Sequence, residues 1–149
     1  MIRVQKNNFD TALELHRLTS GNPVVGGVCS FIGLVRDFSG EQKLNSMTLE
    51  HYPGMTEKEL EKIDREAHQR WPLEASLVVH RYGKLEPGEQ IVLVATASKH
   101  RQVAFEACEF LIDFLKTRAP FWKKEEYING EGWVKARQED DRAADRWCD

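Results

Sequence analysis

The stretch SKHRQVAFEACEFLIDFLKTRAPFWKKEEYI, Ser98 to Ile128, carries the strongest structural signals in the chain. Its first part predicts a helix from about Ser98 to Arg118, because apolar residues recur on one face at helical spacing. Pro120 ends this helix, since a proline ring clashes with the preceding turn and provides no amide hydrogen. The residues from Phe121 to Ile128 then predict a strand, so that a helix and a strand meet within a few residues.

Hydrophobic periodicity predicts further strands and helices on both sides of this stretch. The other expected strands are Ile2 to Gln5, Val24 to Val35, Leu44 to His51, Leu77 to Tyr82, Ile91 to Ala97 and Trp133 to Ala136. One helix is expected from Asp10 to Leu18, and another begins at a capping box formed by Thr56 and Glu59. Because strands alternate irregularly with three helices, the predicted fold class is α+β.

Two of these segments carry more detailed predictions. The β-branched and aromatic residues from Val24 to Val35 predict a buried strand, and its glycines predict bulges or the close approach of two backbones. The charged segment at the end, residues 138–149, predicts a mobile or weakly helical tail.

Length and composition predict one domain that spans residues 1–149. Hydrophobic residues make up 41% and charged residues 30%, which is typical of a soluble globular protein. The net charge of -3 argues against non-specific binding to nucleic acid, and no apolar run approaches the ~20 residues of a membrane span. We therefore expect a cytoplasmic protein that binds neither nucleic acid nor a membrane.

The cysteines Cys29, Cys108 and Cys148 are odd in number, lie far apart and form no C-x-x-C motif. This spacing predicts neither a disulfide framework nor a zinc site. Because Cys108 falls close to the apolar stripe of the long helix, a buried and inert thiol is favoured over a sulfur carrier.

A first cluster of basic residues lies at the start of the long helix, where Lys99, His100 and Arg101 follow one another. Positive charge is unfavourable near the partial positive charge of a helix N-terminus, so stability alone does not explain this placement. The cluster predicts either an anion-binding site or a solvated charged surface.

A second cluster lies at the other end of the same helix, where Lys116 and Arg118 precede Pro120 and Lys123 follows it. The helix dipole favours cations there, which gives Lys116 and Arg118 a structural explanation. However, amines held close together depress each other's pKa, and such an amine can transfer a proton or act as a nucleophile near neutral pH. Together with Arg36, at the end of the glycine-rich strand, and with His100 and Arg101, the two lysines Lys116 and Lys123 favour the binding of an anionic small molecule. They do not name a reaction.

Six segments of the chain match a known family in order and spacing. They are FIGLVRD (Phe31 to Asp37), LEHYPGMTEKEL (Leu49 to Leu60), RWPL (Arg70 to Leu73), HRYGKLEPGE (His80 to Glu89), SKHRQVAFEA (Ser98 to Ala107) and LKTRAPFWKKE (Leu115 to Glu125). In these segments the chain resembles the large, catalytic subunit of molybdopterin synthase. The resemblance covers the chain from about Val24 to Arg137, and LEHYPGM and KTRAPFWK are its most specific parts.

The resemblance implies a sulfurtransferase of molybdenum cofactor biosynthesis. Its substrate is cyclic pyranopterin monophosphate (precursor Z), into which two sulfur atoms are inserted to form the dithiolene of molybdopterin. The sulfur comes from the C-terminal Gly-Gly thiocarboxylate of a small ubiquitin-like subunit, so no cofactor and no metal are implied. The family forms a heterotetramer around a homodimer of large subunits, and its fold is an α/β hammerhead with an additional antiparallel β subdomain.

The resemblance also implies roles for individual residues. Lys116 corresponds to the catalytic lysine and Lys123 to a second active-site lysine. The implied substrate-binding residues are Leu34, Val35, Arg36, His100, Arg101, Lys116, Lys123, Lys124 and Glu125. The family supplies its histidine and arginine, here His100 and Arg101, from the other large subunit. At Leu34 the family has a basic residue, so only a backbone contact is expected from this position.

Two other functions compete with this interpretation. A persulfide sulfurtransferase would use one of the chain's own cysteines and would need an exposed thiol of low pKa. A non-catalytic module that captures the acidic C-terminal tail of another protein would need the basic cluster but no pterin pocket.

Overall fold

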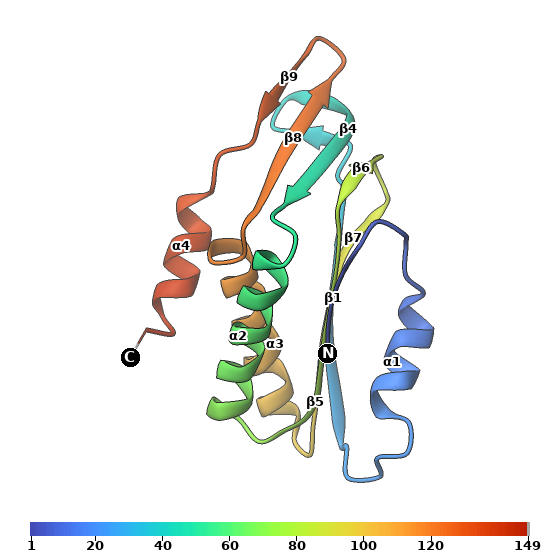
Figure 1. Cartoon of the computed structure of the whole chain (residues 1–149), viewed down its shortest axis with the longest axis vertical. Coiled ribbons are helices and arrows are strands. Elements are labelled where there is room, and N and C mark those ends of the chain that lie inside the picture. Colours follow the sequence, from blue (N-terminus) through green and yellow to red (C-terminus); the bar gives the residue numbers. More distant parts are fainter. Residues whose placement is uncertain (149) are drawn as a thin grey trace.

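The first sheet is central to the computed structural model, which describes residues 1–148. Its strands lie in the order β1-β5-β7-β2, with β1 parallel to β5 and the other neighbours antiparallel. These strands are β1 (Ile2–Gln5), β5 (Leu73–Arg81), β7 (Gln90–Ser98) and β2 (Gly27–Leu34). Helix α1 (Thr11–Thr19) covers one face of this sheet, and α2 (Met55–Arg70) and α3 (Arg101–Thr117) cover the other (Figure 1).

A second, antiparallel sheet stands at one end of the first (Figure 1). Its strands follow the order β3-β4-β8-β9, and β6 also pairs with β4. They are β3 (Phe38–Ser39), β4 (Gln42–His51), β8 (Phe121–Tyr127), β9 (Gly130–Trp133) and β6 (Gly83–Leu85). Because β8 follows α3 directly and pairs with β4, the junction of α3 and β8 lies where the two sheets meet. The arrangement confirms the expected α+β class with its additional antiparallel subdomain.

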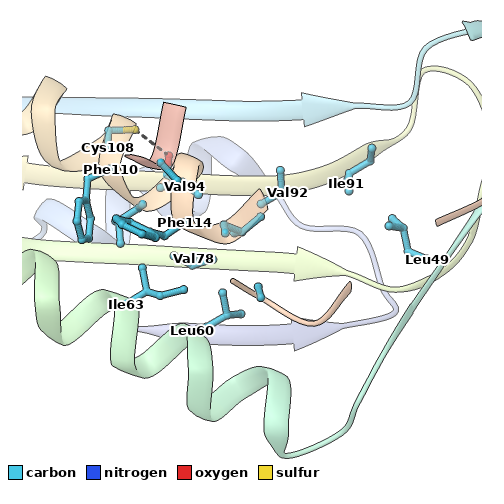
Figure 2. Close-up of a cluster of buried hydrophobic side chains, with 14 of the residues drawn as sticks. Leu49, Leu60, Ile63, Val78, Ile91, Val92, Val94, Cys108, Phe110 and Phe114 are labelled. Atoms are coloured by element: carbon cyan, nitrogen blue, oxygen red, sulfur yellow. Dashed lines mark hydrogen bonds between the residues drawn. The ribbon is translucent and has the colours of Figure 1, made fainter. Parts of the chain in front are cut away.

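The main core lies between the first sheet and the two helices α2 and α3. Leu60 and Ile63 of α2 point toward Val78 of β5, and Phe110 and Phe114 of α3 pack beside them (Figure 2). Full burial of an aliphatic or aromatic side chain of this size stabilises a fold by about 1.5–3 kcal/mol. This core therefore holds the two helices, and with them the end of α3, firmly against the sheet.

The start of α2 differs from the predicted capping box. The N-cap is Gly54, whose amide donates to a carboxylate oxygen of Glu57 at 2.7 Å. Thr56 is buried instead, and its hydroxyl accepts from the amide of Tyr52 and donates to the carbonyl of Pro120. The predicted helix was correct, but Thr56 ties α2 to the start of β8 and does not cap the helix.

Strand β2 forms an edge of the first sheet and most of its residues are exposed, so the prediction of a buried strand was wrong. Val28, Phe31, Ile32 and Leu34 all expose more than a third of their surface, at 41%, 40%, 38% and 52%. The prediction of a close backbone approach was correct just before the strand, since a Cβ on Gly26 would lie 2.1 Å from the carbonyl oxygen of Lys99.

The charged end of the chain is helical, as one of the two alternatives expected for it. Helix α4 (Gln138–Asp145) packs beside α3, with Ala144 buried in the core. Trp147 then contacts the rings of Trp71 and Phe110 edge-on and donates from Nε1 to the carboxylate of Asp113 at 2.8 Å. These contacts fix the last turn of α4 to the helical face of the molecule.

Candidate active site

Lys116 and Lys123 lie on either side of the turn that joins α3 to β8. Lys116 is in the last turn of α3, and Lys123 is the third residue of β8. Pro120 separates the two elements, and the amide of Phe121 donates to the carbonyl of Ala119 at 2.8 Å, which keeps the turn tight. The two side chains are close enough for the charge on Lys116 to act on Lys123.

The amine of Lys123 is withdrawn from water, and burial is the main reason why its pKa lies below the ordinary value. The positive charges of Lys116 and Arg137 lower this pKa further, whereas the carboxylates of Asp140 and Glu125 oppose the shift. A buried amine loses its proton more readily because burial disfavours the charged form. Lys123 is therefore suited to exchanging a proton.

Lys116 is more exposed than Lys123 and has a carboxylate partner. Its Nζ lies 3.5 Å from Oδ1 of Asp140, which belongs to the first turn of α4. Sequence reasoning missed Asp140 and Arg137 as neighbours of the lysines, because it predicted that residues 138–149 form a mobile or weakly helical tail. The acidic residues at positions 139 to 141 are favourable in the first turn of a helix, so they are a signal that could have suggested a helix there.

Arg118 does not act with the two lysines, although it lies beside them in the sequence. Its guanidinium binds the carboxylates of Glu59 and Glu66 on α2, each with a shortest distance of 2.8 Å, and lies over the ring of Phe114. The hydrogen bonds with these carboxylates raise the pKa of Arg118, with that to Glu66 contributing most. Arg118 therefore joins α2 to the end of α3.

Lys124 and Glu125 follow Lys123 along β8 but differ in their surroundings. Lys124 points to the opposite face of the strand, where its Nζ lies 2.9 Å from a carboxylate oxygen of Glu131. Glu125 shares a face with Lys123, is buried, and accepts a hydrogen bond from the hydroxyl of Tyr127. The carboxylate of Glu125 raises the pKa of Lys123 and so favours its charged form.

Two histidines stack around Phe121, two residues before Lys123. The ring of His80 lies parallel to that of Phe121, with centroids 3.7 Å apart, and His51 lies on the same ring at 6.1 Å. His80 is buried and donates from Nδ1 to the carbonyl of Arg81 at 2.8 Å. Burial lowers the pKa of His80 to about 3, so it stays neutral beside Lys123.

The residues at the end of β2 lie beside the turn between β6 and β7. Val35 is buried, donates its amide to the carbonyl of Glu89 and accepts from the amide of Gly88. Leu34 is exposed, and Arg36 lines an open hollow of about 740 Å³ whose other wall is Pro87 and Gly88.

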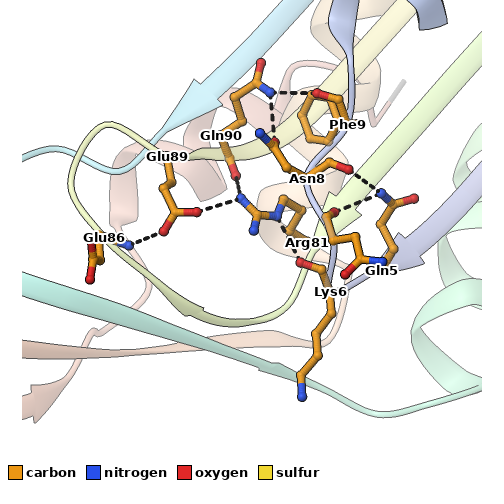
Figure 3. A network of polar contacts seen from close by, with 9 residues as sticks. Gln5, Lys6, Asn8, Phe9, Arg81, Glu86, Glu89 and Gln90 are labelled. Atoms are coloured by element: carbon orange, nitrogen blue, oxygen red, sulfur yellow. Dashed lines mark hydrogen bonds and ion pairs between the residues drawn. The ribbon is translucent and has the colours of Figure 1, made fainter.

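A polar network centred on Arg81 holds the turn between β6 and β7 in place (Figure 3). The guanidinium of Arg81 donates to the carbonyls of Lys6 and Gln90 and to the carboxylate of Glu89. Glu89 also accepts from the amide of Glu86 at 2.7 Å, which is the main cause of its lowered pKa. The wall of the hollow beside Arg36 is thus held by hydrogen bonds and not by apolar packing alone.

His100 and Arg101 lie far from the lysines within one chain. His100 is the N-cap of α3 and Arg101 its first residue, and both are exposed. Lys116 lies fifteen positions after Arg101, which corresponds to about 22 Å of helix at 1.5 Å per residue. The single chain therefore brings Lys116 and Lys123 together but keeps His100 and Arg101 at the opposite end of α3.

Comparison with known proteins identifies the family. The family described as MoaE protein matches residues 4–118 of the chain. The molybdopterin synthase catalytic subunit of Pseudomonas aeruginosa is 56% identical over 98% of this chain and 97% of its own length. The chain belongs to the MoaE family.

Solved structures of MoaE proteins share the whole fold. The MoaE protein from Burkholderia ambifaria superposes with a TM-score of 0.86 at 51% identity, covering 100% of this chain and 98% of its own. The molybdopterin synthase structure from Staphylococcus aureus gives a TM-score of 0.83 at 32% identity, over 89% and 96% of the two chains. The MoaE match includes His100, Arg101 and Lys116, while Lys123 and α4 lie beyond it but within the full-length relatives.

The described residues show two further features of this MoaE chain. Residues 1–148 contain no group of three or more His, Cys, Asp or Glu side chains placed to hold a metal ion. Likewise, no helix in this range has both the length and the apolar character to cross a membrane.

Proposed function

We propose that this chain is the catalytic subunit of a molybdopterin synthase. It transfers sulfur to cyclic pyranopterin monophosphate and so forms the dithiolene of molybdopterin. The observation that carries this proposal is that Lys116 and Lys123 lie together at the junction of α3 and β8. They do so in a chain that is similar to a molybdopterin synthase catalytic subunit along almost its full length. We also infer a cytoplasmic location from the composition of the chain.

The sulfur donor in this proposal is the thiocarboxylated C-terminal Gly-Gly of a small ubiquitin-like subunit. The name of the Pseudomonas relative, a catalytic subunit, supports the existence of at least one further subunit. A thiocarboxylate is an anion, and the amines of Lys116 and Lys123 suit it and the charge that develops as sulfur attacks a pterin carbon. Because the sulfur arrives on the partner, the reaction needs no cofactor and no metal.

The cyclic phosphate of the substrate is also an anion and is assigned to Arg36 with His100 and Arg101. Since His100 and Arg101 cannot reach the lysines of their own chain, they are assigned to the site of a second copy. Leu34 and Val35 offer backbone groups beside Arg36, and Glu125 contributes from β8. Lys124 fits a substrate contact less well, because its ammonium is paired with Glu131 on the other face of the strand.

The first test replaces Lys116 with alanine. In an assay with thiocarboxylated partner and cyclic pyranopterin monophosphate, Lys116→Ala is expected to abolish dithiolene formation while binding of the partner survives. The reason is that the partner contacts much more of the surface than one amine, whereas the reaction depends on a positive charge at the reacting atoms. Lys62→Ala, an exposed lysine of α2, is the matched control. Near-normal turnover by Lys116→Ala would refute the assignment.

The second test addresses the persulfide alternative. Burial is the main cause that raises the pKa of the Cys108 thiol, with the neighbouring Cys29 thiol as the next cause. A thiol of raised pKa is a poor nucleophile. A variant in which Cys29, Cys108 and Cys148 are replaced by serine or alanine is therefore expected to keep turnover within about threefold of wild type, provided that it folds. A folded but inactive Cys-free protein would support a persulfide carrier instead.

The other alternative, a non-catalytic module for acidic tails, makes a different prediction about binding. It requires no pterin pocket, so the chain alone would not bind a pterin phosphate. Calorimetric titration of cyclic pyranopterin monophosphate into the chain without any partner separates the two interpretations.

A further inference from the structure

Helix α4 is anchored at its C-terminal end and reaches the lysine pair with its N-terminal turn. At the anchored end, Arg146 lies 2.6 Å from a carboxylate oxygen of Glu109 and 2.7 Å from one of Asp113. Arg70 of α2 adds a hydrogen bond to the carbonyl of Trp147. Because α2 and α3 both hold this end, the first turn of α4 has a defined position beside the end of α3 (Figure 1).

The residue that α4 presents at this position is Asp140. Its carboxylate is partly shielded, at 28% exposure of the side chain, and forms an ion pair with Lys116. Its neighbour Asp141 is exposed and is not among the residues that pair with Lys116 within the described chain. Of the acidic side chains in this turn, Asp140 is thus the one directed at the site.

Lys123 has no such partner. Within residues 1–148, no carboxylate oxygen lies within 4.0 Å of its Nζ, although its side chain is half-buried. The charged and titratable groups around it are Lys116 from α3, Glu125 from β8, Asp140 and Arg137 from α4 and its N-cap, and the neutral His80 from β5. The two amines of the site therefore differ: that of Lys116 is paired with a carboxylate, and that of Lys123 is half-buried without a paired carboxylate.

We propose that Asp140 is a positioning residue of the active site, which holds Lys116 in place as a fixed cation and leaves Lys123 as the amine that exchanges a proton. This assignment rests on the proposed function and divides its two lysines into separate roles. A fixed cation stabilises negative charge that develops in a reaction without having to reorganise. A half-buried amine next to that cation loses its proton more readily and can then accept one from a reacting group.

The division of roles is tested by Asp140→Asn with Asp141→Asn as its matched control, because both remove one negative charge from the same turn of α4. Removing the Asp140 carboxylate takes away a group that holds the proton on Lys123, so the part of the pH–rate profile governed by Lys123 is expected to move to lower pH. Turnover is expected to fall about tenfold, since Lys116 loses its fixed position. Asp141→Asn is expected to leave both quantities unchanged, and Asp140→Glu to restore most of the turnover.

A second measurement needs no turnover. Lysine amines labelled by reductive methylation with 13C-formaldehyde give NMR signals whose pH titration can be followed, with Lys116→Arg and Lys123→Arg supplying the assignments. The Lys123 signal is expected to titrate at lower pH in Asp140→Asn than in wild type, and unchanged in Asp141→Asn.

Three results would overturn the proposal. The first is an unchanged pH profile with turnover within about twofold of wild type in Asp140→Asn. The second is an equal shift in both aspartate variants, which would show a general effect of charge. The third is that Lys116 and not Lys123 loses its proton over the pH range in which turnover rises. These results differ from failure of the proposed function, in which Lys116→Ala keeps its turnover whatever the lysine signals show.

Discussion

Burial decides the charge of the basic side chains around Phe121. His80 is buried and stacked on this ring, and its pKa of about 3 keeps it neutral near neutral pH. The side chain of Lys123, two residues further along β8, therefore has a neutral neighbour in His80 and not a positively charged one. If His80 were charged, it would repel the ammonium of Lys123 and oppose the binding of a proton there. The neutral imidazole of His80 instead packs against Phe121 at the start of β8, the strand that carries Lys123.

The same burial makes His80 a source of acid sensitivity in the fold. The ordinary pKa of 6.5 applies in the unfolded chain and a pKa of about 3 in the folded one, so the unfolded state binds the proton first as the pH falls. The stability that His80 contributes is complete above pH 6.5 and is lost as the pH falls toward 3. The slope approaches about 1.4 kcal/mol per pH unit within this window.

His80→Asn is expected to flatten this dependence, because asparagine does not titrate and can still donate to the carbonyl of Arg81. Urea unfolding at several pH values between 7 and 4 gives the free energy of unfolding. The quantity to compare is the change of this free energy with pH, because the lost stacking on Phe121 lowers the free energy of unfolding at every pH. His16→Asn, at an exposed position of α1, is the control. Equal slopes in wild type and His80→Asn would show that His80 takes up its proton in the folded protein.

At the scale of the elements, the sequence correctly predicted those features of helices and strands that depend on neighbouring residues alone. Pro120 ends α3 and starts β8 as expected, because the steric effect of proline acts within one turn of helix. The edge position of β2 could not be read from its residues, since an apolar strand looks the same whether a neighbouring strand, a helix or a second molecule covers it. Likewise, the sequence grouped Arg118 with the lysines because they are adjacent, whereas the glutamates that bind it lie on α2, more than fifty residues away.

The candidate site shows the same limit. Lys116 and Lys123 could be found because only a short turn separates them. Asp140 could not, because its place beside Lys116 depends on the packing of Trp147 against Trp71, which brings the end of the chain back to α2 and α3. An acidic run by itself is compatible with a solvated tail. Trp147, at the end of this run, is the residue whose packing distinguishes a helix held against α2 and α3 from a solvated one.

At the scale of the whole molecule, the two basic clusters lie at opposite ends of α3, so the site that we propose needs two chains. The exposed apolar side chains of β2 lie next to the start of α3, where a Cβ on Gly27 would be 3.7 Å from the Cα of Arg101. A second copy that covers this edge would also cover His100 and Arg101. A homodimer in which each copy completes the site of the other accounts for both the exposed strand and the distant basic residues.

Complementation between inactive variants tests this arrangement. Lys116→Ala and Arg101→Ala are each expected to lose most turnover, because each removes a charge that the anionic substrate or donor needs. If the site combines the lysines of one copy with Arg101 of the other, a mixed dimer has one site with both lesions and one intact site. Random exchange makes half of the dimers mixed, so the mixture is expected to regain about a quarter of wild-type turnover.

A mixture of Lys116→Ala with Lys123→Ala is the matched control. Both changes fall in the half of the site that one copy supplies, so each site of the mixed dimer keeps one lesion and no turnover returns. If instead all basic residues of a site came from the same chain, the mixture of Lys116→Ala with Arg101→Ala would also stay inactive, because every site would carry one of the two lesions. The two mixtures therefore distinguish a site shared between copies from a site within one chain, without any structure of the assembly.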